Sequence, residues 1–77
     1  MSIDQFVENF TAQLENEEGA TITAATEFRS LEEWDSLVAL AVIAMVDEKY
    51  NTKLTGDEIR ASSTVEDLYE KVKAKVA

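Results

Sequence analysis

The chain of 77 residues contains no cysteine and no histidine, and its 16 acidic against 7 basic residues give a net charge of -9. Without cysteine and histidine, disulfide bonds, thiolate catalysis, the common structural zinc sites and the usual general bases are excluded. The acidity disfavours binding to nucleic acid and to anionic membranes, so basic protein surfaces are the expected partners.

Length and hydrophobic content define the class of structure. With 45% hydrophobic and 30% charged residues the chain is balanced enough to fold, and its length predicts one domain over residues 1–77. No segment approaches the roughly 18 apolar residues of a membrane span, and the N-terminus lacks a basic region followed by an apolar run. We therefore expect a cytoplasmic monomer.

The first segment has one apolar stripe at helical spacing, made of Ile3, Phe6, Val7, Phe10 and Leu14. Ser2 and Gln5 have the arrangement of a capping box at its start. Polar residues and a glycine follow, so we expect the helix to end between Asn16 and Gly19.

Residues 20–33 lose this periodicity and predict a long connector. Ile22, Phe28 and Leu31 are the apolar residues that would pin it to a core, and residues 30–33 predict a single helical turn. A loop of this length is unusual in a compact domain and is more often functional than idle.

A second helix is predicted to begin with Asp35 as its N-cap and Ser36 at its first position, and to run to Tyr50, with Asn51 as the stop. Leucine, alanine and methionine favour a helix here, and the stretch is too long for a buried strand. Its first three turns have no polar face.

Two further helices are predicted. Thr55 and Glu58 form a second capping box, which opens a short helix that closes by Ser62. The last helix carries a stripe from Val65 to Val76 and is capped by Ser63 with Glu66 or by Thr64 with Asp67.

The sequence therefore predicts an all-α fold, a four-helix bundle with three main helices, a short third helix and a long first loop. The residues predicted to form its core are Phe6, Phe10, Leu14, Phe28, Leu40, Ile43, Val46, Tyr50, Leu54, Ile59, Val65, Leu68 and Val72.

Ser36 is the candidate functional residue, although Asp35-Ser36 is also an ordinary way to begin a helix. A phosphate ester on Ser36 would lie at a helix N-terminus, where free N–H groups and the helix dipole favour an anion without any lysine or arginine. Asp35 could help a modifying enzyme to hold the cation that it needs near the transferred phosphate.

Asp35-Ser36-Leu37 resembles the signature of the acyl carrier proteins (ACPs), four-helix proteins with a 4'-phosphopantetheine arm on the serine of an Asp-Ser-Leu motif. The resemblance covers nearly the whole chain, and it includes Phe28-x-x-Leu31, Asp47-Glu48-Lys49-Tyr50, Leu54, Ile59 and Thr64-Val65-x-Asp67-Leu68.

The resemblance implies a carrier and not an enzyme. The 4'-phosphopantetheine arm, taken from coenzyme A, would be attached to Ser36 with Asp35 and Leu37 beside it, and would carry acyl intermediates as thioesters. The implied partners are a phosphopantetheinyl transferase and an acyl-ACP synthetase, ketosynthase or acyltransferase with basic and hydrophobic docking surfaces. Fatty-acid, polyketide or other specialised lipid biosynthesis are the implied pathways, and a chain beginning at Met1 favours a free-standing carrier.

Two features depart from the family pattern. Trp34 precedes the motif where many fatty-acid carriers have a small residue; either it packs across the connector onto the helix ends, or its indole forms part of a partner surface.

The second departure is in the second helix, where the family's exposed acids are replaced by Val38, Ala41, Ala44 and Met45, and only Asp47 and Glu48 keep the pattern. Leu37, Val38 and Ala41 cannot all face one core, so some apolar surface near Ser36 should be exposed. We expect a docking surface with this apolar centre and an acidic rim made of Glu32, Glu33, Asp35, Asp47, Glu48, Asp57 and Glu58.

Other functions remain open at this point. The chain could be an aminoacyl or peptidyl carrier, or an acidic helical adaptor that is never modified. A carboxylate calcium site is weaker because no Asp-x-Asp-x-Asp-Gly loop exists, and Ser36 as a nucleophile is weaker still because no base is available.

Overall fold

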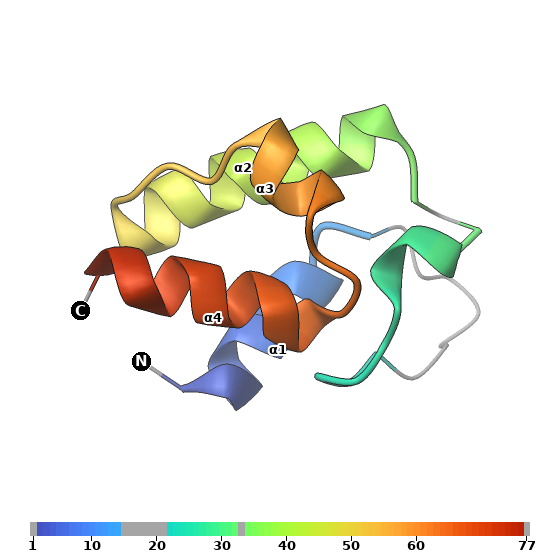
Figure 1. The fold of residues 1–77 in the computed structure, drawn as a ribbon, viewed down its shortest axis with the longest axis horizontal. Helices are drawn as coiled ribbons and strands as arrows, with labels where there is room; N and C mark the ends of the chain where they lie inside the picture. Colours follow the sequence, from blue (N-terminus) through green and yellow to red (C-terminus); the bar gives the residue numbers. More distant parts are fainter. Residues whose placement is uncertain (1, 15–21, 33, 77) are drawn as a thin grey trace.

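The computed structural model describes residues 2–14, 22–32 and 34–76, and within them the chain is helical without any strand. The elements are α1 (Ile3–Thr11), the 3-10 turn η1 (Phe28–Ser30), α2 (Ser36–Tyr50), α3 (Gly56–Arg60) and α4 (Val65–Val76) (Figure 1). This confirms the predicted all-α bundle with a short third helix.

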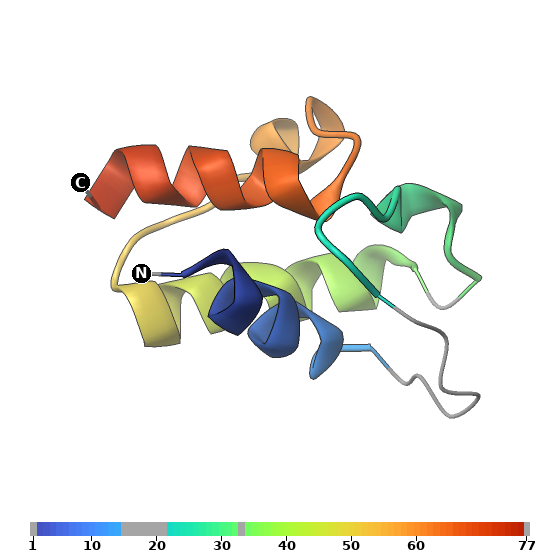
Figure 2. The ribbon, with the colours of Figure 1, turned by 90° about the horizontal axis from the view of Figure 1, so that it is seen from below.

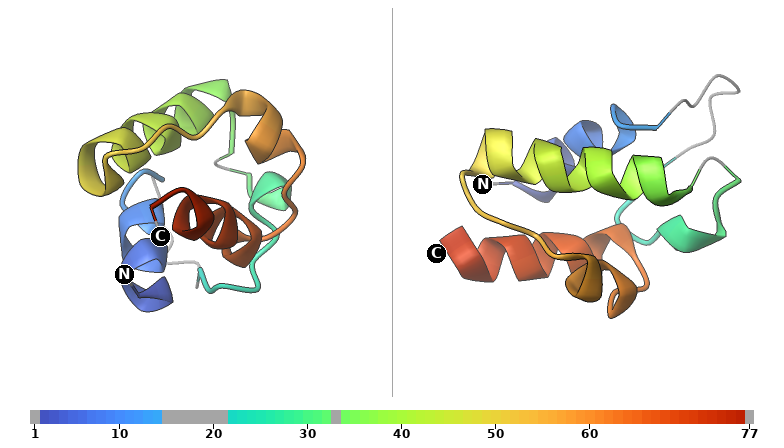
Figure 3. Two further views of the ribbon diagram at one scale, coloured as in Figure 1. Left: turned by 60° about the vertical axis from the view of Figure 1, so that its left-hand side comes forward. Right: turned by 90° about the horizontal axis from the view of Figure 1, so that it is seen from above.

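The helices surround one core. The helix α1 packs against both α2 and α4, and the short α3 bridges α2 and α4 on another side of the bundle. An end-on view shows the four helices around a common centre (Figure 3). The turn η1 and the first turn of α2 lie together at the end of the molecule opposite the last turn of α4 (Figures 1 and 2).

The helix α1 ends earlier than the sequence predicts. Its last residue is Thr11, whose hydroxyl donates to the carbonyl of Val7 at 2.7 Å. A tighter turn follows, in which the N–H of Leu14 donates to the carbonyl of Thr11, and this turn keeps Leu14 buried. The prediction of an end between Asn16 and Gly19 is therefore wrong, because the threonine hydroxyl and the turn divert the chain while the apolar spacing continues.

At the start of α1, only one of the two hydrogen bonds of the predicted capping box is present. The hydroxyl of Ser2 accepts from the N–H of Gln5 at 3.1 Å, as expected. The amide of Gln5, however, donates to the side chain of Asn9. One of the orphan N–H groups of the first turn is thus satisfied by a side chain.

The caps of α2 agree with the prediction at both ends. Asp35 accepts from the N–H of Val38 at 2.8 Å, and Asn51 closes the helix in the left-handed conformation with φ 53°. Asparagine tolerates this backbone region better than most residues, and its N–H donates to the carbonyl of Asp47.

The caps of the two later helices also follow the sequence. Thr55 and Glu58 form the full capping box of α3. Of the two caps considered for α4, the structure has Thr64 with Asp67, whose carboxylate accepts from the N–H groups of both Ser63 and Thr64.

The connector is held by its own turn and by α4. The predicted turn at residues 30–33 lies slightly earlier, at Phe28–Ser30, and Phe28 is fully buried there. The carbonyls of Ala24 and Thr26 accept from the first N–H groups of α4, at 2.9 and 3.1 Å. These bonds tie the connector that precedes η1 to the start of α4.

The buried core confirms most of the predicted residues and corrects the face of α2. The buried apolar residues are Phe6, Phe10, Leu14, Phe28, Val42, Met45, Val46, Leu54, Ile59, Val65, Leu68, Tyr69 and Val72, and the predicted Ile43 and Tyr50 are half-buried.

The prediction that Leu40 belongs to the core is wrong, since 61% of this residue's surface is exposed. The inward face of α2 is formed instead by Val42, Met45 and Val46, which follow one another at the three- and four-residue spacing of a single helix face. Leu40 lies on the opposite face.

In the described part of the chain, every helix is too short or too polar to span a bilayer.

Candidate functional site

Ser36 is an exposed residue in the first turn of α2. The first N–H groups of a helix have no partner within the helix. Here the carboxylate of Asp35 accepts a hydrogen bond from one of them, the N–H of Val38. The remaining N–H groups and the positive end of the helix dipole therefore lie close to the Ser36 hydroxyl. A negatively charged group on this residue would be placed favourably.

Trp34 fixes the chain just before Ser36. Its ring stacks on Phe10 with 6.0 Å between centroids and meets the edge of Phe28 at 4.8 Å. Phe10 and Phe28 also pack edge to face. The half-buried tryptophan thus packs across the connector onto α1 and η1, which is the first of the two roles considered for it.

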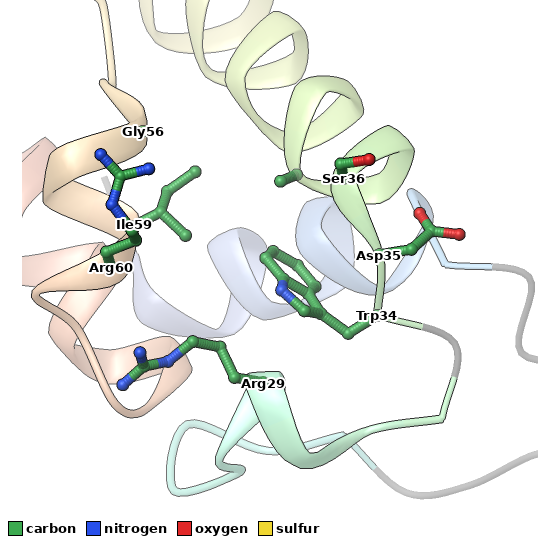
Figure 4. Close-up of a pocket in the computed structure, with 8 residues that line it drawn as sticks. Arg29, Trp34, Asp35, Ser36, Gly56, Ile59 and Arg60 are labelled. Carbon is green, nitrogen blue, oxygen red and sulfur yellow. The ribbon is translucent and has the colours of Figure 1, made fainter.

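A pocket of about 250 Å³ opens beside Ser36, between α2, α3 and η1 (Figure 4). The residues that line it are Arg29, Trp34, Asp35, Ser36, Ala39, Gly56, Ile59 and Arg60. The indole of Trp34 and the side chain of Ile59 supply apolar wall, while Asp35 and Ser36 form one polar edge. This pocket joins three segments that are far apart in the sequence.

Two arginines contribute to this pocket, and sequence reasoning missed both. In Figure 4, Arg29 and Arg60 lie on the wall across from Ser36, and the Ser36 hydroxyl points away from them. Arg60 pairs with Asp57, one turn earlier in α3. No motif links these arginines to the serine, so only the packing of η1 and α3 could reveal them.

The exposed face of α2 is apolar, as expected, but its residues differ from the prediction. Leu37 and Leu40 are 74% and 61% exposed, and Ala44 is exposed on the same side of the helix. Val38 and Ala41 are half-buried.

Met45, which the sequence places on this face, is only 3% exposed and belongs to the core. We name Leu37, Leu40 and Ala44 the apolar face of α2.

Most of the predicted acidic rim is exposed. Glu32, Asp35, Asp47, Glu48 and Asp57 are all at the surface, and Glu33 lies outside the described residues. Asp47 pairs with Lys53 at 3.5 Å.

Glu58 does not belong to the rim, because its carboxylate is used within the fold. It accepts from the N–H of Thr55 and pairs with Lys75 of α4 at 2.9 Å. The hydrogen bond from Lys75 holds the pKa of Glu58 below its usual value. The residue therefore joins α3 to α4.

A calcium site has no geometric basis in the part of the chain that the structure describes. No three acidic side chains of residues 2–14, 22–32 and 34–76 are grouped so that they could hold a metal ion. The carboxylates are instead dispersed or used as helix caps.

Comparison with known protein families gives a match over most of the chain. The family model described as a phosphopantetheine attachment site matches residues 5–72, which include Ser36 and every residue that lines the pocket. Neither a curated protein nor a solved structure gives a significant match to the chain.

Proposed function

The chain belongs to the phosphopantetheine attachment family, and from that premise we propose that Ser36 is the residue that bears its arm. As a member of this family the protein is a carrier and not an enzyme, and its prosthetic group is 4'-phosphopantetheine. Its partners accordingly include a phosphopantetheinyl transferase and enzymes of the pathway that it serves.

The observation that carries this assignment is the exposed hydroxyl of Ser36 in the first turn of α2. The other described serines of the matched span are Ser30, Ser62 and Ser63. Ser62 is fully buried, and its hydroxyl donates to the carbonyl of Glu58. Ser30 lies in the 3-10 turn η1. Ser63 precedes α4, but the first N–H groups of that helix are already occupied by the carbonyls of Thr26 and Ala24 and by the hydroxyl of Thr64.

The residues around Ser36 fit a phosphodiester. Free N–H groups of the first turn and the positive end of the helix dipole favour its negative charge. Trp34 and Ile59 offer apolar contact to an uncharged arm. When bound, the arm supplies the thiol that forms a thioester with the cargo, and a chain without cysteine or histidine offers that thioester no internal nucleophile of the usual kinds.

We propose that the cargo is an acyl group and that the carrier serves a specialised lipid or metabolite pathway. The further resemblances along the chain support an acyl cargo, while the Asp35-Ser36-Leu37 motif itself is compatible with an aminoacyl or peptidyl cargo as well. The exposed Leu37 and Leu40 on α2, where the family usually carries acids, support a specialised pathway. An acyl-ACP synthetase, a ketosynthase and an acyltransferase are the partner classes that such a cargo requires.

The apolar face of α2 supports a particular mode of docking. Leu37 and Leu40 project beside Ser36, and the acids Asp35, Asp47 and Glu48 are exposed along the same helix. A partner surface with an apolar centre and basic residues around it complements this arrangement. We therefore assign the first contact with partner enzymes to α2.

Intact mass measures the attachment directly. The apo protein is incubated with coenzyme A and a broad-specificity phosphopantetheinyl transferase, and the wild type should gain the mass of one phosphopantetheine. Ser36→Ala should gain nothing, while Ser63→Ala, which removes another exposed serine hydroxyl, should react like the wild type. A wild type that stays unmodified, or a Ser36→Ala variant that is modified equally, would contradict the assignment and favour an unmodified acidic adaptor.

A further inference from the structure

Arg29 is an exposed cation that lines the pocket beside Ser36. Lys53, Arg60 and Lys75 each pair with a carboxylate. Among the described residues Arg29, Lys49, Lys71 and Lys73 have no such pair, and of these four only Arg29 lines the pocket. A guanidinium with no carboxylate partner in the described part of the chain is available to bind an anion from outside.

The position of Arg29 is fixed by the core. Phe28, its neighbour in η1, is fully buried and packs against Phe10 and Trp34. The connector is further held by the bonds from Ala24 and Thr26 to α4. The side chain of Arg29 therefore begins in an ordered turn, and its guanidinium lies at the pocket wall opposite Ser36 (Figure 4).

Arg60 adds a second guanidinium on the same side of the pocket. Its ion pair with Asp57 is exposed, with 71% and 87% of the two side chains accessible. Exposed pairs of this kind contribute little to stability, so Arg60 can turn toward a better partner at little cost. The pocket thus has a cationic wall in a molecule whose net charge repels anions elsewhere.

We propose that Arg29, assisted by Arg60, binds an oxyanion carried on the arm at Ser36 and so holds the arm against Trp34 in the pocket. This inference rests on the proposed attachment at Ser36. The oxyanion is the phosphodiester of the arm or a carboxylate at the end of a dicarboxylic cargo, because a guanidinium recognises both through paired N–H donors.

Trp34 is the only tryptophan of the chain and lines the same pocket, so it reports on occupation. The wild type is prepared as apo protein, with the free-thiol arm, and with arms transferred from succinyl- and butyryl-coenzyme A. Intact mass verifies every loading. The indole N–H resonance of Trp34, the side-chain N–H resonance of Arg29 and the quenching of Trp34 fluorescence by acrylamide are then compared.

In the wild type, loading with an arm that carries the recognised oxyanion should shift both resonances and protect Trp34 from the quencher, and Arg29→Gln should abolish the protection. Lys49→Gln is the matched control. It removes one exposed charge at the other end of α2, about 20 Å from Ser36 at 1.5 Å per residue, which is beyond the Debye length of about 8 to 10 Å. This variant should behave like the wild type.

The loaded forms separate the two sources of the oxyanion. An Arg29-dependent effect that is already complete with the free-thiol arm assigns the phosphodiester. An effect that arises only with the succinyl and not with the butyryl arm assigns the cargo carboxylate. If Arg29→Gln matches Lys49→Gln in every loaded form, the inference is overturned while the attachment stands; if mass shows no arm on the wild type, the attachment itself has failed.

Discussion

Trp34 connects the packing of the bundle with the candidate site. One face of its indole stacks on Phe10 in the core, while part of the ring lines the pocket beside Ser36. The residue before the motif is therefore both an anchor for the connector and a wall of the pocket. A small residue at this position, as in many fatty-acid carriers, could supply neither contact.

The two faces of α2 can be compared through two residues of similar size. Met45→Ala should lower the free energy of unfolding by about 2 to 5 kcal/mol, because it opens a cavity among buried neighbours. Leu40→Ala should change it by less than about 0.5 kcal/mol, since the leucine is mostly in water already. Urea denaturation followed by circular dichroism measures both, and equal losses would contradict this orientation of α2.

The inward residues of α2 were the hardest feature to predict from sequence. A helix with a polar face marks its own outward side, but residues 37–46 contain no charged side chain that could do so. The sequence pattern therefore predicts Leu40 inside and Met45 outside, the reverse of the arrangement found. The presence of exposed apolar surface was predictable, because ten apolar residues in succession cannot all face one core.

Glu58 shows how a single carboxylate can organise two elements. It completes the capping box of α3 with Thr55 and reaches Lys75 in the last turn of α4. The short α3 has five residues, too few to be stable by itself in water. Its place in the bundle, and with it the position of Ile59 and Arg60 at the pocket, depends on such tertiary ties.

The contribution of Glu58 should depend on pH in a defined way. Lys75 and the cap hold the pKa of Glu58 below its ordinary value of 4.5, so the folded protein binds this proton less readily than the unfolded chain does. The carboxylate's stabilisation is therefore complete above pH 4.5 and is lost as the pH falls through the lowered pKa. The difference in unfolding free energy between the wild type and Glu58→Gln should shrink over this window.

Urea titrations at a series of pH values measure that difference. Asp67, whose pKa is lowered by hydrogen bonds from the N–H groups of Ser63 and Thr64, titrates in both proteins and cancels in the comparison. In a Lys75→Gln background the difference at neutral pH should already be smaller. A difference that is independent of pH would show that the carboxylate's charge is not the source of its effect.

Helix ends were predicted well wherever a cap defines them. Asp35, Thr55 and Thr64 each place a side-chain oxygen three residues before the N–H that it accepts from, and such a local pattern can be read from sequence. The end of α1 has no comparable signal, and its apolar spacing continues past the point where the helix stops. The cationic wall of the pocket depends on contacts between η1, α2 and α3, which no local pattern contains.

The charge of the whole molecule opposes its compact state. With a net charge of -9, like charges repel across a small bundle, and the three ion pairs found among the described residues are partly or fully exposed. Salt screens both effects, but exposed ion pairs are worth little in water. The repulsion should therefore dominate.

We expect added sodium chloride to raise the Tm of the apo protein. In a domain of this size each 1 kcal/mol of stability gained raises the Tm by about 4 to 8 °C, so the effect is easily measured by thermal unfolding. The double variant Glu8→Gln and Glu70→Gln removes two exposed acids and should show a higher Tm at low salt with a smaller gain from salt. A Tm that falls with salt would mean that the ion pairs outweigh the repulsion.

The two hydrogen bonds between the connector and the first turn of α4 also bear on the order of assembly. Ala24 and Thr26 accept from N–H groups that occur much later in the chain, so these contacts close a long loop. The entropic cost of closing this loop slows their formation. A polypeptide still being synthesised has the serine and its helix before it has α4. The hydrogen bonds that tie the connector to α4 can therefore form only after the last helix has left the ribosome and folded back.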